Sequence, residues 1–230
     1  MVKRWGQKPF QFMLYAALGF VVLTLVAMLL YPGGTVADPA AERYLFFHNF
    51  FSDLGRTEAI DGEANALSAI LFVIALTGAG LSLAWFFLSA PPLFRRSRAA
   101  WVVSLLGSAS GIVSGLSFVG VAWTPANLWL EAHRFFVMTA FEAFLGAALL
   151  YMVAIFLDRD YPNVYALAFL LFAGLLAGYL VLLFNGPRPD SVEGLMIQAT
   201  GQKAIVYAAI VCMGFQSYGA LRLAGVDSTV

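Results

Sequence analysis

Residues able to do chemistry gather in one stretch of this chain, Tyr44–Asn65, which reads YLFFHNFFSDLGRTEAIDGEAN. Its imidazole, guanidinium and carboxyl groups belong to His48, Asp53, Arg56, Glu58, Asp61 and Glu63. Imidazole and carboxyl groups can transfer protons, and two histidines with one carboxylate can hold a metal ion. Together with the other histidine of the chain, His133, we therefore take His48 and Asp53 as candidate catalytic and metal-binding residues.

The metal hypothesis has a simpler alternative. No HxxxH or HExxH pattern places two imidazoles on one helical face, so His48 and His133 would meet only through a tertiary contact. Otherwise both are interfacial histidines that hydrogen-bond to nearby acids. The single cysteine, Cys212, excludes an intramolecular disulfide and a thiolate zinc site. No cofactor is predicted.

Glu131 and Glu142 suggest a second kind of chemistry. They are eleven residues apart, so on one helix they share a face, with Glu142 about 16 Å deeper in the membrane. A carboxyl group near mid-bilayer is costly when it is ionised. We expect Glu142 to be protonated and hydrogen-bonded to Ser110, Ser114, Tyr207 or a backbone carbonyl, or else to serve as a proton relay or substrate anchor.

The composition indicates what must position these residues. The chain is 61% hydrophobic and 11% charged, with a mean hydropathy of +0.83, whereas an average soluble domain is about 25% charged. A net charge of zero offers no basic surface for nucleic acid. A membrane-spanning helix needs about 20 apolar residues, and six segments are long enough: 10–31, 64–90, 100–123, 130–157, 164–184 and 204–223. We predict an all-α polytopic membrane protein, a six-transmembrane-helix bundle forming one domain over residues 1–230.

Lysine and arginine predict the orientation of this bundle. One side of the membrane receives Lys3, Arg4, Lys8, Arg95, Arg96, Arg98, Arg159 and Arg222. The other side receives Arg43, Arg56, Arg134, Arg188 and Lys203. Because cytoplasmic loops carry the excess of basic residues, both termini are predicted to be cytoplasmic, in the cell membrane. The first apolar run is longer than the roughly 7–15 residues of a signal peptide core, so we expect it to be a retained helix.

Two longer loops, Pro32–Glu63 and Asn185–Lys203, are then extracytoplasmic, and each is predicted to carry a short interfacial helix. In the first loop the aromatic rings of Tyr44–Phe51 would lie in the interface, where such rings concentrate. In the second, Ser191–Thr200 has apolar residues at helical spacing. Arg188 and Lys203 would supply counter-charges for the acids or for a lipid phosphate.

Glycines spaced four apart predict where helices approach closely. Gly107, Gly111 and Gly115 share one face of the third segment, and Gly174 and Gly178 repeat this spacing in the fifth. Small residues at this spacing allow close helix packing in membranes. The partner helix can belong to the same chain or to a neighbouring one.

Two stretches resemble the DUF998 family of six-span prokaryotic membrane proteins, which has no established activity. NFFSDLGRTEAIDGEANALSAILFVIALTGAGL is similar to its Ser-Asp-Leu-Gly segment, polar turn, Asn and Gly-containing helix. SFVGVAWTPANLWLEAHRFFVMTAF is similar to its later Pro-containing turn and helix-opening His. The resemblance covers roughly residues 49–141 and matches Ser52, Asp53, Gly55, Asn65 and His133 to the family pattern.

A more distant similarity is to the membrane hydrolases that include alkaline ceramidases, which cluster Ser, His and Asp around zinc. The sixth segment, AIVYAAIVCMGFQSYGALRL, lacks their paired histidines. This departure puts a zinc hydrolase in doubt.

These observations leave three functional hypotheses. The favoured one is a non-catalytic protein that binds a lipid or another hydrophobic ligand, or a subunit of a membrane complex, with membrane lipids, other subunits or a second copy as partners. The alternatives are a hydrolase acting on lipid headgroups at an outer His/Asp site and a small proton-coupled transporter using Glu142. The candidate ligand-binding residues are Asp53, Arg56, Asn65, Glu131, His133, Glu142, Arg188 and Lys203.

Overall fold

The computed structural model describes residues 6–226, which form six long helices and no β-strand among them. The helices are α2 (Lys8–Leu30), α3 (Ala66–Ser89), α4 (Arg98–Trp123), α5 (Leu130–Leu157), α6 (Asn163–Asn185) and α7 (Val192–Val226). All six are long and apolar enough to cross a membrane. Two short 3-10 helices, η1 (Phe51–Gly55) and η2 (Pro91–Phe94), lie in the connections. The prediction of an all-α protein with six helices long and apolar enough to span a membrane is confirmed for the described residues.

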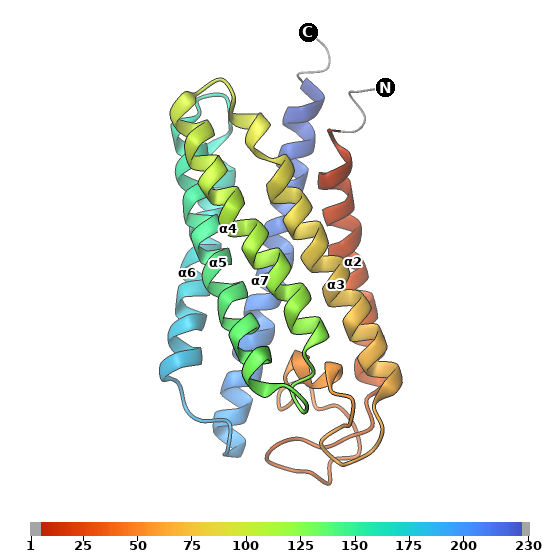
Figure 1. Cartoon of the computed structure of the whole chain (residues 1–230). Coiled ribbons are helices and arrows are strands. Elements are labelled where there is room, and N and C mark those ends of the chain that lie inside the picture. The colour runs from red at the N-terminus through yellow and green to blue at the C-terminus, as the bar shows by residue number, and fades with distance from the viewer. Residues whose placement is uncertain (1–5, 227–230) are drawn as a thin grey trace.

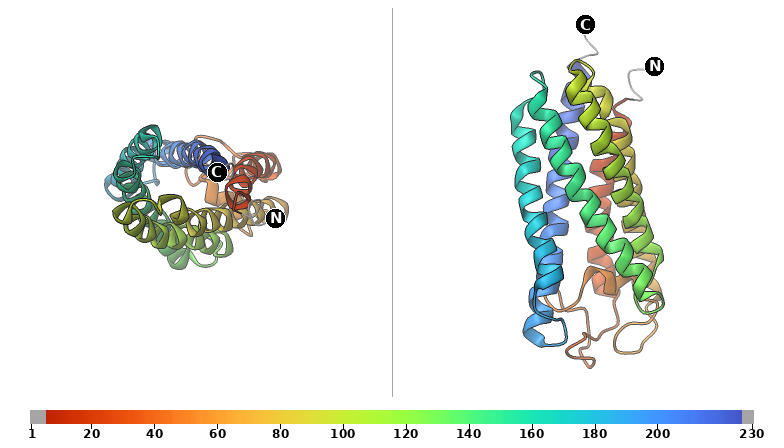
Figure 2. Two further views of the ribbon diagram at one scale, coloured as in Figure 1. Left: turned by 90° about the horizontal axis from the view of Figure 1, so that it is seen from above. Right: turned by 60° about the vertical axis from the view of Figure 1, so that its left-hand side comes forward.

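The helices form a closed ring, which Figure 2 shows from above. Each packs against its neighbours along the chain, and α7 closes the ring by packing against both α6 and α2. Both ends of the described chain lie at one end of this ring, and the long connection over residues 31–65 lies at the other (Figure 1). The basic segment 95–98, between α3 and α4, lies at the end that holds the termini.

The ring has an apolar outside and an aromatic inside. Val211 is 72% exposed and Leu29 is 85% exposed, as expected for side chains that face lipid. Aromatic rings from several helices meet inside, and the Phe87 ring lies 5.3 Å from the Tyr151 ring and 6.3 Å from the Phe144 ring. Edge-to-face and offset contacts between rings at such distances stabilise the interior.

Glycines and serines of α4 make close contacts with α3 and α5. A methyl group at Gly111 would lie 2.1 Å from the Phe87 ring, and one at Gly115 would lie 2.5 Å from the carbonyl oxygen of Gly80. On the α5 side, the Ser110 hydroxyl donates to the carbonyl of Ala143 at 2.7 Å. Because glycine has no side chain, the helix backbones can approach closely at these positions. The serine hydroxyl groups donate hydrogen bonds to backbone carbonyls of the neighbouring helix. Gly107 also contacts α5, at Tyr151.

Gly174 and Gly178 of α6 lie differently. Both are exposed, and a methyl group at either position would meet no atom within 4 Å. Gly178 borders an apolar groove between α6 and α7, which is also lined by Gly201, Ala204 and Ala208. The close approach that this spacing permits is therefore not used within the described part of the chain.

The second long loop differs from its prediction. The expected interfacial helix over Ser191–Thr200 is the first part of α7, which runs unbroken from Val192, so the connection from α6 is only residues 186–191. Ser191 starts the helix, because its hydroxyl accepts the backbone N–H of Gly194 at 3.1 Å. The Gln198 amide then ties this first part to α6 through the carbonyl of Leu182 at 3.0 Å. No proline interrupts the helix afterwards.

The connection over residues 31–65, which we call the cap, folds back over the mouth of the ring. Its tight turns use Gly34 and Gly62, at φ of 81° and 93°, a region that favours glycine. The expected interfacial helix at Tyr44–Phe51 is a set of turns followed by η1. Its rings divide between two environments: Tyr44 and Phe51 are buried, whereas Phe46 and Phe47 are exposed.

Candidate functional site

Asp53 lies in η1 and organises the inner side of the cap. Its carboxylate accepts the backbone N–H of Phe50 at 2.8 Å and the side-chain amide of Asn49 at 3.3 Å. The same Asn49 amide donates to the carbonyl of Gly34 at 2.8 Å, and its oxygen accepts the N–H of Leu45 at 2.8 Å. The buried Asn49 and Asp53 thus hold the two halves of the cap together.

Burial raises the pKa of the Asp53 carboxyl above its ordinary value of 3.8. The donors on Phe50 and Asn49 and the charges of Arg56 and Lys203 act in the opposite direction and do not cancel this effect. Taking an ionised carboxyl group out of water is costly, so the neutral form gains relative to the unfolded chain. The hydrogen bonds and the raised pKa together describe a carboxyl group that supports the cap.

Lys203 of α7 holds the cap from below. It is 2% exposed, and its ammonium group donates to the carbonyl of Asn49. The ammonium nitrogen also lies 5.2–5.4 Å from the ring centres of Tyr44, Phe46 and Phe51, within reach of cation–π attraction. Lys203 is therefore a buried anchor beneath the cap.

The neighbouring residue on α7, Gln202, fastens η1 directly. The oxygen of its side-chain amide accepts the backbone N–H of Phe51 at 2.8 Å. Phe51 then packs between the rings of Phe20 on α2 and Tyr207 on α7, at 5.7 and 5.8 Å. Adjacent residues Gln202 and Lys203 thus fix successive parts of the cap over the centre of the ring.

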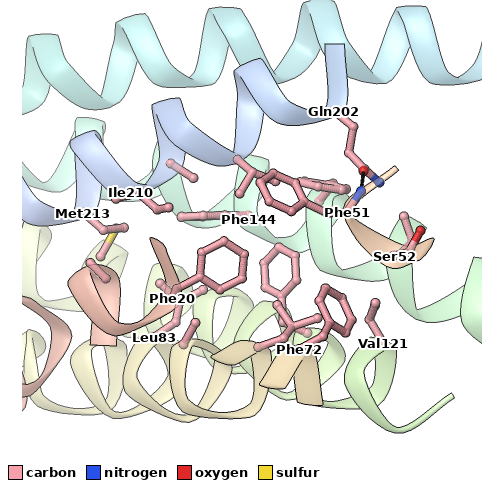
Figure 3. A pocket seen from close by; sticks show the side chains of 18 of the residues that line it. Phe20, Phe51, Ser52, Phe72, Leu83, Val121, Phe144, Gln202, Ile210 and Met213 are labelled. Atoms are coloured by element: carbon pink, nitrogen blue, oxygen red, sulfur yellow. Dashed lines mark hydrogen bonds between the residues drawn. The ribbon is translucent and has the colours of Figure 1, made fainter. Parts of the chain in front are cut away.

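Beneath η1 lies an apolar cavity of about 110 Å³. Side chains from α2, α3, α4, α5 and α7 line it, and η1 lines its outer end (Figure 3). Of the described residues that line it, only Ser52 and Gln202 have polar side chains. The remaining lining residues are Met13, Ala17, Phe20, Phe51, Phe72, Leu76, Ala79, Leu83, Phe118, Val121, Val137, Phe141, Phe144, Val206, Ala209, Ile210 and Met213. An engineered apolar cavity of about 150 Å³ in another protein binds benzene or xenon, so this cavity has room for a small apolar group.

The predicted catalytic and metal-binding residues do not form a metal cluster. Among the residues that the structure describes, no three His, Cys, Asp or Glu side chains are placed to hold a metal ion. The His133 ring is buried and bonds through Nδ1 to the carbonyl of Thr124 at 2.7 Å, at the connection between α4 and α5. His48 is half-buried in a turn of the cap. Asp53 faces Asn49 and Phe50, as described above.

The remaining predicted ligand-binding residues are spread over several places. Asn65 donates its amide to the carbonyls of Leu54 and Arg56 at 3.0 and 2.8 Å, and so joins the cap to the start of α3. Arg56 in turn donates to the carbonyl of Glu58 at 3.2 Å. Both residues therefore support the structure of the cap.

Three other candidates lie on the outer surface. Glu131 is exposed and forms an ion pair with Arg134 at 3.3 Å. Arg188 is exposed in the connection between α6 and α7, and Glu142 is exposed on the outside of α5. Of the partners expected for Glu142, Ser110 instead bonds to the carbonyl of Ala143 at 2.7 Å. The expectation that Glu142 points into the bundle is wrong, because its position on α5 faces away from the ring.

No family model, curated protein or solved structure matches this chain. The resemblance to the DUF998 family therefore stays a prediction from the short motifs around Ser52–Gly55 and His133.

Sequence reasoning missed the cavity and the role of Gln202. The signal for Gln202 was weak but present, because it is an uncharged polar residue beside a lysine at the edge of an apolar run. Ser52 was noted only through the family resemblance. Nothing in the sequence distinguishes the apolar residues that line the cavity from those that fill the core, because several of them, such as Phe144 and Met213, belong to both groups.

Proposed function

We propose that this protein is a non-catalytic integral membrane protein that binds a hydrophobic ligand in the capped cavity. The cavity, with its hydrocarbon lining, is the observation that carries the proposal. An empty space in a packed interior is unfavourable, because the atoms around it lose van der Waals contacts. A hydrophobic ligand would restore those contacts, and the cap would cover it.

The charge distribution supports a position in the cell membrane with the termini in the cytoplasm and the cap outside. Arg95, Arg96 and Arg98 are close together in a short connection, where basic residues weigh most in the positive-inside rule. A ligand would then reach the cavity from the lipid of the outer leaflet or from the outer surface.

A second role, as a subunit of a membrane assembly or of a homo-oligomer, has one observation in its favour. Gly174 and Gly178 lie on the outer face of α6 without a packing partner in the described chain. Glycines at this spacing allow another membrane helix to approach closely.

The alternative functions, a lipid-headgroup hydrolase and a proton-coupled transporter, have less support from the structure. A hydrolase needs His48, Asp53 and His133 to converge, whereas His133 bonds to Thr124 and Asp53 to the cap. A proton-coupled transporter needs a carboxyl group on an inner pathway, whereas Glu142 is on the outside of α5.

Filling the cavity tests the proposal. Ala79 of α3 lines the cavity, so Ala79→Phe should occupy the space where a ligand binds. We expect lipid extracts of the purified protein, analysed by mass spectrometry, to contain a bound apolar molecule that Ala79→Phe lacks. The matched control is Ala177→Phe, because Ala177 is exposed on α6 and lines no part of the cavity. Identical extracts from all three proteins, with no molecule in stoichiometric amount, would contradict the proposal.

A further inference from the structure

The cavity has a polar end, and its polarity is determined by one hydrogen bond. The Gln202 side chain uses its oxygen, Oε1, to accept the N–H of Phe51. A backbone N–H can only donate, so the atom of the Gln202 amide that bonds to Phe51 must be its oxygen. The amide nitrogen, Nε2, is then left as a donor for another partner. Gln202 is 9% exposed and lines the cavity, and its Nε2 has no hydrogen-bond partner among residues 6–226.

Ser52 supplies a second polar group at the same end. It lies in η1, one residue after the Phe51 that binds Gln202, and it lines the cavity. Its hydroxyl makes no hydrogen bond within the described part of the chain. Figure 3 shows Gln202 and Ser52 together at one end of the cavity, with apolar side chains at the other. Gln202 is 9% exposed and Ser52 is half-buried, so neither polar group is fully enclosed. Both are accessible and without a partner in the described chain, and both are therefore suited to meet a ligand.

The charge of the lining restricts what that ligand can be. None of the lining residues in the part of the chain that the structure describes is charged. Lys203, the nearest lysine along the chain, directs its ammonium group at Asn49 and the rings of Tyr44 and Phe51. An ionised head group would therefore lose its hydration without gaining an opposite charge. A neutral head group with an oxygen acceptor would lose less and could accept from Nε2.

The lining also indicates the direction of the ligand's chain. Gln202 and Met213 both line the cavity from α7 and are eleven residues apart, about 16 Å along the helix axis. The cavity is therefore elongated along α7, and its volume of about 110 Å³ limits the ligand to a small molecule. Such a space is suited to one short, unbranched hydrocarbon chain.

We propose that the cavity takes a neutral single-chain ligand whose head carries an oxygen acceptor, such as an ester, an alcohol or a protonated acid. Gln202 Nε2 and Ser52 Oγ hold the head beneath η1, and the chain extends toward Met213. This inference rests on the proposed function, because it names the ligand class of the same cavity. It also gives Gln202 two roles, since one amide fastens the cap and recognises the head group.

A matched pair of ligands tests whether the cavity prefers a ligand with an oxygen acceptor. Methyl butanoate and pentane have the same number of carbon atoms and are small enough for the cavity, but only the ester carries an acceptor. Uptake of each by the purified full-length protein in detergent is measured by headspace gas chromatography, and Ala79→Phe protein gives the baseline for uptake by the detergent. We expect the ester to bind more tightly than the alkane. Gln202→Met should weaken ester binding by roughly fivefold, as loss of one neutral hydrogen bond predicts, and should leave pentane binding unchanged.

Two further variants complete the design. Ser52→Ala should also weaken only ester binding, without touching the bond between Gln202 and Phe51. Gln198→Met is the matched control, because Gln198 lies one turn earlier on α7 and bonds to Leu182 and Pro187 outside the cavity. It should leave the binding of both ligands unchanged.

The outcomes separate this inference from the proposed function. Equal binding of ester and alkane, insensitive to Gln202→Met and Ser52→Ala, would overturn the inference and leave hydrophobic binding intact. Uptake of both ligands no greater than in Ala79→Phe would overturn both. If Gln202→Met lost pentane binding as well, its cavity would have collapsed. The inference would then stand only if Ser52→Ala weakened ester binding and left pentane binding unchanged.

Discussion

At the scale of single residues, the buried polar side chains at the cap all form hydrogen bonds with its backbone. Asp53, Asn49 and Lys203 are all buried, and each forms a hydrogen bond with a backbone atom of the cap. Such groups are costly to bury alone and acceptable when paired. A cluster of titratable residues that suggests catalysis in the sequence therefore serves, at these three positions, to fold a loop.

Asp53→Asn should separate the charge of this residue from its hydrogen bonds. An amide oxygen can accept from Phe50 and Asn49 as the carboxylate does. Because burial raises the Asp53 pKa above 3.8, the folded protein binds this proton more tightly than the unfolded chain does. Stability from this group is thus fully present below about pH 4 and is lost as pH rises through the folded pKa.

We therefore expect Asp53→Asn to be at least as stable as the unsubstituted protein at neutral pH, with the difference shrinking toward pH 4. Thermal unfolding in detergent across this range measures it. Asp190→Asn, an exposed acid in the connection between α6 and α7, is the control and should change nothing. A clear loss of stability at neutral pH in Asp53→Asn would show that the charge itself supports the cap.

At the scale of elements, the same residue type has opposite consequences in two helices. Gly111 of α4 lies against the Phe87 ring, whereas Gly174 of α6 has open space beside it. Glycines four residues apart predict a packing face in both helices. Which of the two faces is covered by a neighbouring helix depends on how the helices are arranged in the ring. α4 lies between α3 and α5, and the outer face of α6 has no neighbour within the described chain.

Alanine substitutions at these two glycines should differ in sign. Gly111→Ala places a methyl group 2.1 Å from the Phe87 ring and should destabilise the protein by about 1–3 kcal/mol. Gly174→Ala meets nothing and should be neutral or stabilise α6 by up to about 1 kcal/mol through helix propensity. Unfolding in mixed detergent measures both. Equal effects would mean that α3 and α4 can move apart at no cost. Destabilisation by Gly174→Ala alone would point to a partner helix on α6.

At the scale of the whole molecule, the ring has two chemically different ends. One end carries the short basic connection 95–98 and both ends of the described chain, and the other carries the cap (Figure 1). The polar end of the cavity, with Ser52 and Gln202, lies beneath the cap. The direction of the molecule in the membrane therefore decides on which side this polar end lies.

Reporter fusions should show this direction. We expect green fluorescent protein fused to the C-terminus to fluoresce and alkaline phosphatase fused there to be inactive, as for a cytoplasmic terminus in a bacterial host. Alkaline phosphatase inserted at Arg188, in the connection between α6 and α7, should be active. The reverse pattern would place the cap in the cytoplasm and contradict the positive-inside prediction.

The sequence by itself determined the number of spans and their approximate limits. A helix in hydrocarbon must be apolar along its whole crossing, because unpaired polar groups there are costly, so the spans appear as continuous runs. Leu130–Leu157 matches its predicted limits, whereas α7 begins twelve residues before the predicted start at 204. The missed part is more polar, with Glu193, Gln198 and Gln202, and therefore did not belong to an apolar run.

The tertiary structure alone decided where the site lies. The distinction between Gln198 and Gln202, four residues apart on one helix, comes from what each faces: α6 for the first, and η1 with the cavity for the second. Likewise Glu142 faces outward and Ser52 lines the cavity, although the sequence marks the carboxyl group as the more reactive. A cavity is a space that packing leaves unfilled, so it depends on how six helices and the cap fit together and has no residue type of its own.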